Sequence, residues 1–76
     1  MEAVDTVCLI GRVLERCPQG LLLCDCCTGQ RVMVRTDQAC RFCPGDLVRV
    51  AYSGAMTRSL PPQITALEIP CVCGRN

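Results

Sequence analysis

The sequence predicts one small all-β domain, a closed barrel of five strands in Greek-key order with a short helical turn between the third and fourth strands. Two observations support this prediction. Segments rich in Val, Leu and Ile recur along the 76 residues, and clusters that contain Gly or Pro separate them. We expect a single domain over residues 1–76, because a chain of this length has room for only one hydrophobic core.

The predicted strands follow from apolar residues that alternate or cluster between turns. They comprise residues 6–16, 21–27, 30–36, 45–54 and 63–69. In the first strand, Gly11 lies where a long strand would bend or bulge. In the fourth, the alternation places Val48 and Tyr52 on one face. In the fifth, it places Ile69 on the face opposite Ile64.

The turn between the second and third strands leaves their register open. If only Thr28 and Gly29 form the turn, the odd-numbered leucines of the second strand face the core. If Gln30 also belongs to the turn, the opposite face turns inward, because a shift of one residue exchanges the faces. We favour the second register, which buries Leu22, Cys24 and Cys26.

Two connections have a distinctive composition. Asp37 can cap one or two helical turns over residues 38–43, and Pro44 ends them. The second connection is the loop 53–62, SGAMTRSLPP, which is longer than a tight turn. Within it Gly54 permits a bend at positive φ, and Ser59 can hydrogen-bond the backbone ahead of the two prolines. This loop either holds the strand register or contacts a ligand.

The carboxy-terminal half, PGDLVRVAYSGAMTRSLPPQITALEI, resembles small bacterial OB-fold domains that have a Gly-Asp strand start and a Ser-x-Pro-x-Gln loop. The matching residues are Gly45, Asp46, Tyr52, Gly54, Ser59, Pro61, Pro62 and Gln63. The resemblance implies an OB-fold barrel over roughly residues 4–70. Many such domains are secreted or lipid-anchored, and this localisation does not transfer to the present sequence.

Composition argues against several functions. The eight basic residues are all Arg and nearly balance seven acids, so the net charge of +1 gives little attraction to a nucleic-acid backbone. The sequence has no His, the commonest general base, and its acids are scattered among turns and strand ends. We therefore expect no enzymatic activity.

The amino-terminal residues MEAVDTVCLIGRV carry acids where a secretory signal would carry positive charge. No apolar stretch approaches the length of a membrane span. We expect a cytoplasmic chain that does not engage a membrane. A signal peptide removed before this sequence begins is the alternative.

Nine cysteines are present, and two pairs of them have spacings that suit a metal ion. In the OB-fold that the sequence resembles, the third and fifth strands are parallel, so the segments that follow them emerge at the same end of the barrel. One interpretation is then a tetrahedral zinc site formed by Cys40, Cys43, Cys71 and Cys73. The alternatives are disulfides and, our preferred reading, reduced thiols that pack in the core, with Cys8, Cys17 and Cys24 as small hydrophobes.

The function that we predict is a noncatalytic OB-fold binding module for an oligonucleotide or another small ligand. Such folds bind across strands two and three and the adjoining loops. The candidate contacts are Arg12, Arg31, Met33, Arg35, Tyr52 and Arg58. The case for single-stranded nucleic acid is weak, because cations are plentiful and stacking aromatics are not. The alternative is a protein-interaction module that dimerises or docks on a partner.

Overall fold

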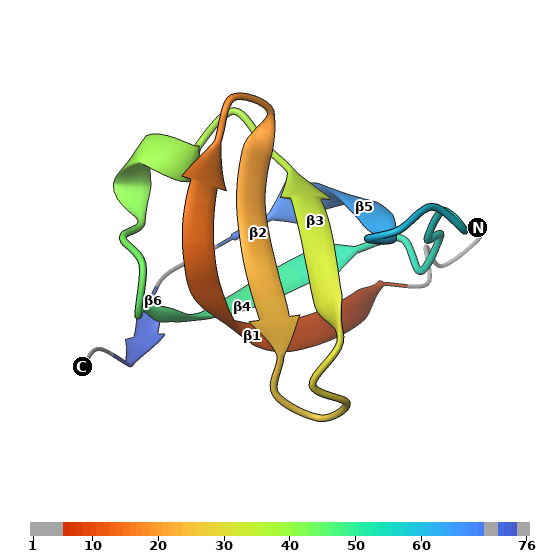
Figure 1. Ribbon diagram of the computed structural model, residues 1–76, viewed down its shortest axis with the longest axis horizontal. Helices are drawn as coiled ribbons and strands as arrows, with labels where there is room; N and C mark the ends of the chain where they lie inside the picture. Colours follow the sequence, from red (N-terminus) through yellow and green to blue (C-terminus); the bar gives the residue numbers. More distant parts are fainter. Residues whose placement is uncertain (1–5, 70–71, 75–76) are drawn as a thin grey trace, which may run out of the picture.

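The computed structural model describes residues 6–69 and 72–74 and confirms the predicted all-β barrel (Figure 1). A single 3-10 turn, η1 (Ala39–Arg41), separates the third and fourth strands. The strands are β1 (Val7–Cys17), β2 (Gly20–Asp25), β3 (Arg31–Arg35), β4 (Leu47–Tyr52), β5 (Gln63–Glu68) and β6 (Val72–Gly74). The sequence did not predict β6.

The barrel closes because β1 pairs with strands on both of its edges. The strand order is β1-β2-β3-β5-β4, and β4 returns to pair with β1. β3 and β5 are parallel, as the resemblance implied, and the other neighbours are antiparallel. The short β6 pairs with the start of β4. This is the order of an OB-like Greek-key barrel.

The long strand β1 lies between β2 and β4, and Gly11 pairs with a residue of each. Gly11 pairs with Asp25 of β2 and with Val48 of β4. An ideal Cβ at Gly11 would lie only 3.0 Å from a backbone oxygen of β2, so glycine permits this close approach. The bulge that we predicted at Gly11 occurs three residues later, where Leu14 is the extra residue.

The β2–β3 hairpin has the opposite register to the one that we favoured. Leu21 and Leu23 pair with Val34 and Val32, and all four side chains are fully buried. The expectation that the even-numbered side chains of β2 face inward is wrong.

The cause of the error is the length of the hairpin loop. The side chain of Asp25 accepts a hydrogen bond from the N–H of Cys27 (2.8 Å), and the carbonyl of Asp25 accepts one from Gly29 (2.8 Å). These bonds form a loop of four residues, 26–29, whereas we considered loops of two or three. The observed loop is two residues longer than the two-residue loop, and an even difference leaves the same side chains facing the core.

A second bulge, in β5, changes which side chains face the core. Tyr52 of β4 pairs with Ala66, and the preceding residue, Ala51, pairs with Glu68. Leu67 is therefore an extra residue, and Leu67 and Glu68 are both exposed. The parity then shifts, and Ile69 is buried on the same side as Ile64. The expected separation of these two isoleucines is wrong for this reason.

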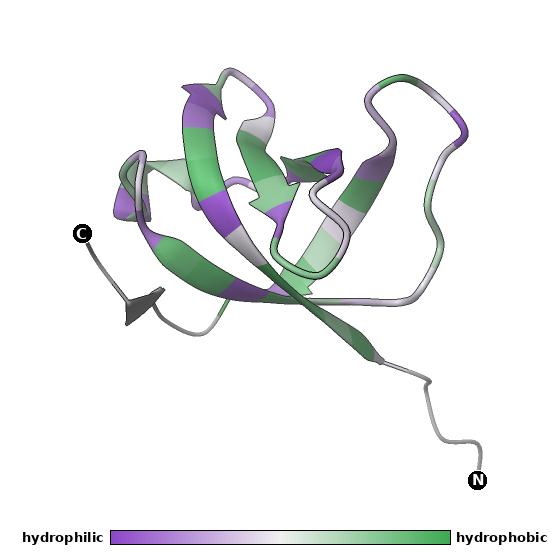
Figure 2. Cartoon of the chain, turned by 60° about the horizontal axis from the view of Figure 1, so that its bottom comes forward, coloured by the Kyte–Doolittle hydropathy of each residue, from purple (hydrophilic) through white to green (hydrophobic). Residues whose placement is uncertain are grey.

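The core is aliphatic, with both aromatic side chains of the sequence inside it. It contains Leu9, Val13, Leu21, Leu23, Val32, Val34, Phe42, Val48, Val50, Tyr52, Ile64 and Ile69. Figure 2 shows apolar and polar residues alternating along the strands. The predicted grouping of Val48 and Tyr52 on one face of β4 is confirmed, and that face is the buried one. In the described chain, no helix is long and apolar enough to cross a membrane.

The cysteines do not fill the core as we expected. Cys8 is exposed, and Cys17 and Cys24 are only half-buried. On β1 the inward positions belong to Leu9, Gly11 and Val13, so Cys8 lies on the outer face. The prediction of packed core cysteines is therefore wrong for these three residues.

Candidate functional site

The loop 53–62 is braced by its own side chains. The hydroxyls of Thr57 and Ser59 lie 2.6 Å apart, and Ser59 Oγ donates to the carbonyl of Pro61 (3.0 Å). Thr57 also bonds both backbone groups of Gln63: its Oγ1 accepts from the N–H (2.9 Å) and its own N–H donates to the carbonyl (3.0 Å). Ser59 therefore bonds the backbone as predicted, but its partner is the carbonyl of Pro61 and not a group ahead of the prolines.

Two further features fix the ends of this loop. At one end Gly54 has φ of +96°, which confirms the predicted bend at positive φ. At the other end the carbonyl of Pro62 accepts a hydrogen bond from the N–H of Met33 in β3 (2.9 Å). The loop therefore has a defined position over the outer side of the barrel.

A groove of about 400 Å³ lies between this loop and the outer side of the β2–β3 hairpin. Its lining residues are Leu22, Gln30, Arg31, Leu60, Pro61 and Pro62. We call it the loop groove. The side chain of Leu60 is 93% exposed although neighbouring residues of the loop are hydrogen-bonded. An exposed leucine in an ordered loop offers an apolar contact to a ligand.

The outer side of β3 continues this surface. Arg31, Met33 and Arg35 face outward, while the two valines between them are fully buried. Met33 is half-buried and pairs with Leu22, so an apolar strip separates the two exposed arginines. Four residues along a strand place their Cα atoms about 13 Å apart. These three predicted contacts therefore share one face.

The remaining predicted contacts are less uniform. Arg58 is exposed on the loop 53–62. Arg12 is half-buried on β1, and its Nη1 donates to the carbonyl of Gly45 (2.6 Å), which ties it to the turn before β4. Tyr52 is only 8% exposed, so its expected role as an exposed contact is wrong. It belongs to the inward-facing side chains of β4.

Burial of Tyr52 removes the expected aromatic side chain from the predicted binding surface. The sequence has two aromatic residues, and the other, Phe42, is 1% exposed. Base stacking on an aromatic side chain therefore has no exposed partner on this chain.

Two of the described acids have structural hydrogen bonds. Asp25 closes the β2–β3 loop, as described above. The buried Asp46 accepts from the N–H of Cys43 through Oδ2 (2.9 Å), which stabilises the turn after η1. These carboxylates lie in separate turns and serve the backbone around them.

The predicted zinc ligands are only partly described. Cys40 and Cys43 are exposed at and after η1. Cys71 and the side chain of Cys73 lie outside the described residues. The described residues contain no group of three or more His, Cys, Asp or Glu side chains that could hold a metal ion. The zinc site therefore stays a prediction.

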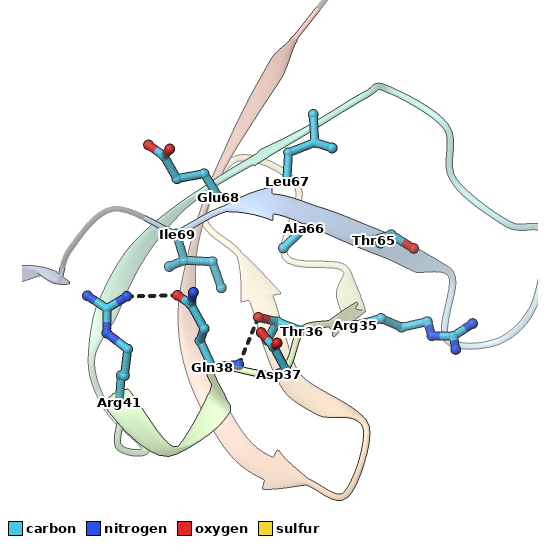
Figure 3. A pocket seen from close by; sticks show the side chains of 10 residues that line it. All are labelled: Arg35, Thr36, Asp37, Gln38, Arg41, Thr65, Ala66, Leu67, Glu68 and Ile69. Atoms are coloured by element: carbon cyan, nitrogen blue, oxygen red, sulfur yellow. Dashed lines mark hydrogen bonds between the residues drawn. The ribbon is translucent and has the colours of Figure 1, made fainter.

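Sequence reasoning missed a second cavity, a cleft of about 540 Å³ between β5 and the segment 36–41 (Figure 3). We call it the β5 cleft. It is lined by Arg35, Thr36, Asp37, Gln38, Arg41, Thr65, Ala66, Leu67, Glu68 and Ile69. The expected one or two helical turns over residues 38–43 reduce to a three-residue 3-10 turn, and the segment that leads into this turn forms one wall of the cleft. The sequence feature that could have indicated the short turn is the small number of residues between Asp37 and Pro44.

Comparison with known proteins gives no match to this chain among family models, curated proteins or solved structures.

Proposed function

We propose that this protein is a noncatalytic binding module whose ligand lies in the loop groove and along the outer face of β3. The observation that supports it most directly is Leu60, which is 93% exposed in a braced loop above an apolar groove. A loop that is already ordered loses little conformational entropy when a ligand binds.

The groove favours a ligand that is partly apolar and partly anionic. Leu22, Leu60 and the two prolines form an apolar wall, and Arg31 lies at its edge. A protein segment with a bulky apolar side chain and a nearby carboxylate has this combination. We therefore favour a protein partner as the ligand, which was the alternative function that we drew from the sequence.

A single-stranded oligonucleotide is the second candidate. The exposed Arg31 and Arg35 can contact phosphates, and a guanidinium can stack on a base. Two facts weigh against it: both aromatic side chains are buried, and the net charge is only +1. We expect affinity for a 12-nucleotide oligo(dT) or oligo(rU) to be no tighter than about 100 μM at physiological salt.

The decisive experiment is a selection of linear peptides from a phage-displayed random library on the immobilised full chain, followed by affinity measurements on synthetic peptides. Leu60→Asp should reduce the affinity at least tenfold, because it places a charge in the apolar groove. Leu14→Asp is the matched control, since Leu14 is also exposed but lies on β1. We expect it to leave the affinity unchanged.

Fluorescence anisotropy with the two oligonucleotides tests the second candidate. Tight, salt-sensitive binding that falls when Arg31 and Arg35 are both changed to Glu would favour the oligonucleotide over a protein ligand. If neither peptides nor oligonucleotides depend on Leu60 or on these arginines, the loop groove is not the binding site.

A further inference from the structure

β3 and β4 pair with different halves of β5. Gln63, Ile64 and Thr65 pair with β3, whereas β5 continues to Glu68 and pairs there with β4 alone. The β5 cleft borders the second half, on the side where β3 would lie if it were longer. Figure 3 shows this gap between β5 and the segment that follows β3.

Two hydrogen bonds of Thr36 explain why the chain turns away from β5 after the end of β3. The N–H of Thr36 donates to the carbonyl of Gln19 in the β1–β2 turn (3.2 Å), and the hydroxyl of Thr36 accepts from the N–H of Gln38 (3.1 Å). These two bonds direct the segment toward η1. They keep it from extending the ladder beside β5.

The direction of the backbone groups of β5 follows from the hydrogen bonds at its start. The carbonyl of Pro62 faces β3, because it accepts from the N–H of Met33 (2.9 Å). Gln63 faces the opposite way, because both of its backbone groups bond to Thr57. Successive strand residues direct their backbone groups to opposite sides, so Ala66 faces the same side as Pro62.

The pairing of β3 with β5 ends at Thr65, so on this side the carbonyl of Ala66 has no strand partner in β3. A longer β3 would offer the N–H of Asp37, yet within residues 6–69 no backbone hydrogen bond joins Asp37 to β5. The carbonyl of Ala66 therefore faces the β5 cleft. A backbone acceptor at an open strand edge is the group that an added strand uses.

The opposite wall of the cleft is held in place by two contacts. Arg41 donates through Nη1 to the side-chain carbonyl of Gln38 (2.7 Å), and its guanidinium lies 5.4 Å from the centre of the Phe42 ring. The guanidinium has five N–H donors, so this position leaves donors for a carboxylate. Arg41 is exposed.

We propose that the β5 cleft binds one extended segment of a partner protein, which adds as a strand to the free edge of β5 and places a carboxylate at Arg41. The segment would occupy the line that β3 abandons after Arg35. The Cα atoms of Thr65 and Ile69, at the two ends of the β5 stretch that borders the cleft, lie about 13 Å apart, which suits a segment of four or five residues.

The shape of the cleft selects a single strand over the edge of another sheet. The wall formed by residues 36–41 stands opposite β5, so a wide sheet has no access to the edge. The bulge at Leu67 also twists the exposed end of β5 and discourages edge-to-edge pairing. This site is separate from the loop groove, which lies at the other end of β5, and the proposal does not depend on that function.

The test is the same peptide selection on the full chain, read with two matched pairs of variants. Gln38→Trp fills the β5 cleft, and Gln30→Trp makes the same change in the loop groove. Arg41→Glu reverses the proposed carboxylate contact, and Arg49→Glu makes the same change on the outer side of β4. Amide spectra and melting temperatures establish that each variant is folded.

For peptides that bind this cleft, we expect Gln38→Trp and Arg41→Glu to weaken binding at least tenfold, and Gln30→Trp and Arg49→Glu to have no effect. Backbone N-methylation of the peptide should cost about tenfold at alternate residues, because each removes one strand hydrogen bond. The amides of residues 66–69 should exchange more slowly in the complex.

Three outcomes would overturn the proposal. One is a selection in which Gln38→Trp weakens the binding of no peptide. This includes the case in which Gln30→Trp abolishes the binding of every peptide, because those peptides bind the loop groove. Another is binding that N-methylation leaves unchanged at every position, which would show recognition by side chains alone. The last is unchanged affinity in Arg41→Glu.

Discussion

The two ends of β5 differ in how they are enclosed. At its start, Gln63 lies between β3 and the loop 53–62, and Thr57 holds both of its backbone groups. At its end, Ala66 and Glu68 pair with β4 only, and the opposite edge borders the β5 cleft. One strand therefore has an enclosed end and an open end.

This difference separates the two binding sites that we propose. The enclosed end supports the loop groove, whose lining is mainly apolar side chains with Gln30 and Arg31 beside them. The open end offers a backbone carbonyl and a charged wall. Side chains select a ligand by shape and charge, whereas a strand edge accepts many sequences in one conformation.

The largest expected effect comes from breaking the junction where β3 leaves β5. Gly20 pairs with Arg35, and an ideal Cβ at Gly20 would lie 1.8 Å from the carbonyl oxygen of Val34. Gly20→Ala must therefore move backbone, and we expect it to lower the free energy of unfolding by about 3 kcal/mol or more. Urea denaturation measures this change.

Gly29→Ala is the control for that substitution. A Cβ at Gly29 meets nothing within 4 Å, so its cost comes only from φ of +76° and should be about 1 kcal/mol. Equal costs at the two glycines would show that the close approach of β2 to β3 is unimportant.

A smaller effect is expected at the enclosed end, where Gly54 begins the braced loop. Gly54→Val introduces a β-branched side chain at φ of +96°, which should lower the free energy of unfolding by about 2 kcal/mol. Contact with Val7 adds little, because the nearest atom is 3.4 Å from the ideal Cβ. Gly54→Asn should cost less, since Asn tolerates positive φ. An unchanged melting temperature in the Val variant would remove this role.

The hydrogen bonds of the Thr57 hydroxyl should contribute about 1 kcal/mol to the free energy of unfolding. Thr57→Val removes the hydroxyl that contacts Ser59 and accepts from the N–H of Gln63. We expect faster amide hydrogen exchange at Gln63 and a small loss of stability. Thr65→Val changes an exposed threonine on β5 and should stay within about 0.5 kcal/mol of the parent. If both variants behave alike, the hydroxyl does not brace the loop.

The smallest effect that we expect is a difference in reactivity among the cysteine thiols. Cys40 and Cys43 are exposed, and we expect them to react with a thiol reagent in the native protein as quickly as Cys26. The half-buried Cys17 and Cys24 should react more slowly. Mass spectrometry of the labelled peptides measures each rate.

The same sample tests the predicted zinc site by elemental analysis. One equivalent of zinc, with Cys40 and Cys43 protected until a chelator is added, would contradict the expected reactivity. It would support the four-cysteine site.

Much of the barrel was predictable because alternation and turn residues are local signals. The strand positions, the inward face of β4 and the role of Gly54 all follow from them. Tyr52 shows the limit of their use: it shares the face of Val48 and Val50, so its burial followed from the alternation that we had identified. Assigning it to the exposed surface ignored that pattern.

The features that sequence reasoning missed depend on changes of one or two residues. The extra residue at Leu67 reverses the parity of Ile69, and the side chain of Asp25 closes a four-residue hairpin loop. Both result from tertiary pairing or side-chain turns, which periodicity does not encode. The β5 cleft was missed because its walls come from two segments far apart in the sequence, residues 35–41 and 65–69, which only the tertiary fold brings together.

The burial of Tyr52 also determines how this protein can be observed in solution. The sequence contains one tyrosine and no tryptophan, and Tyr52 lies in the core at the end of β4. Its ultraviolet emission therefore reports on the barrel interior from a single position. A tryptophan introduced at Gln30 or Gln38 would be the sole indole of the chain, so each blocking variant would also carry its own fluorescent probe of the cavity that it fills.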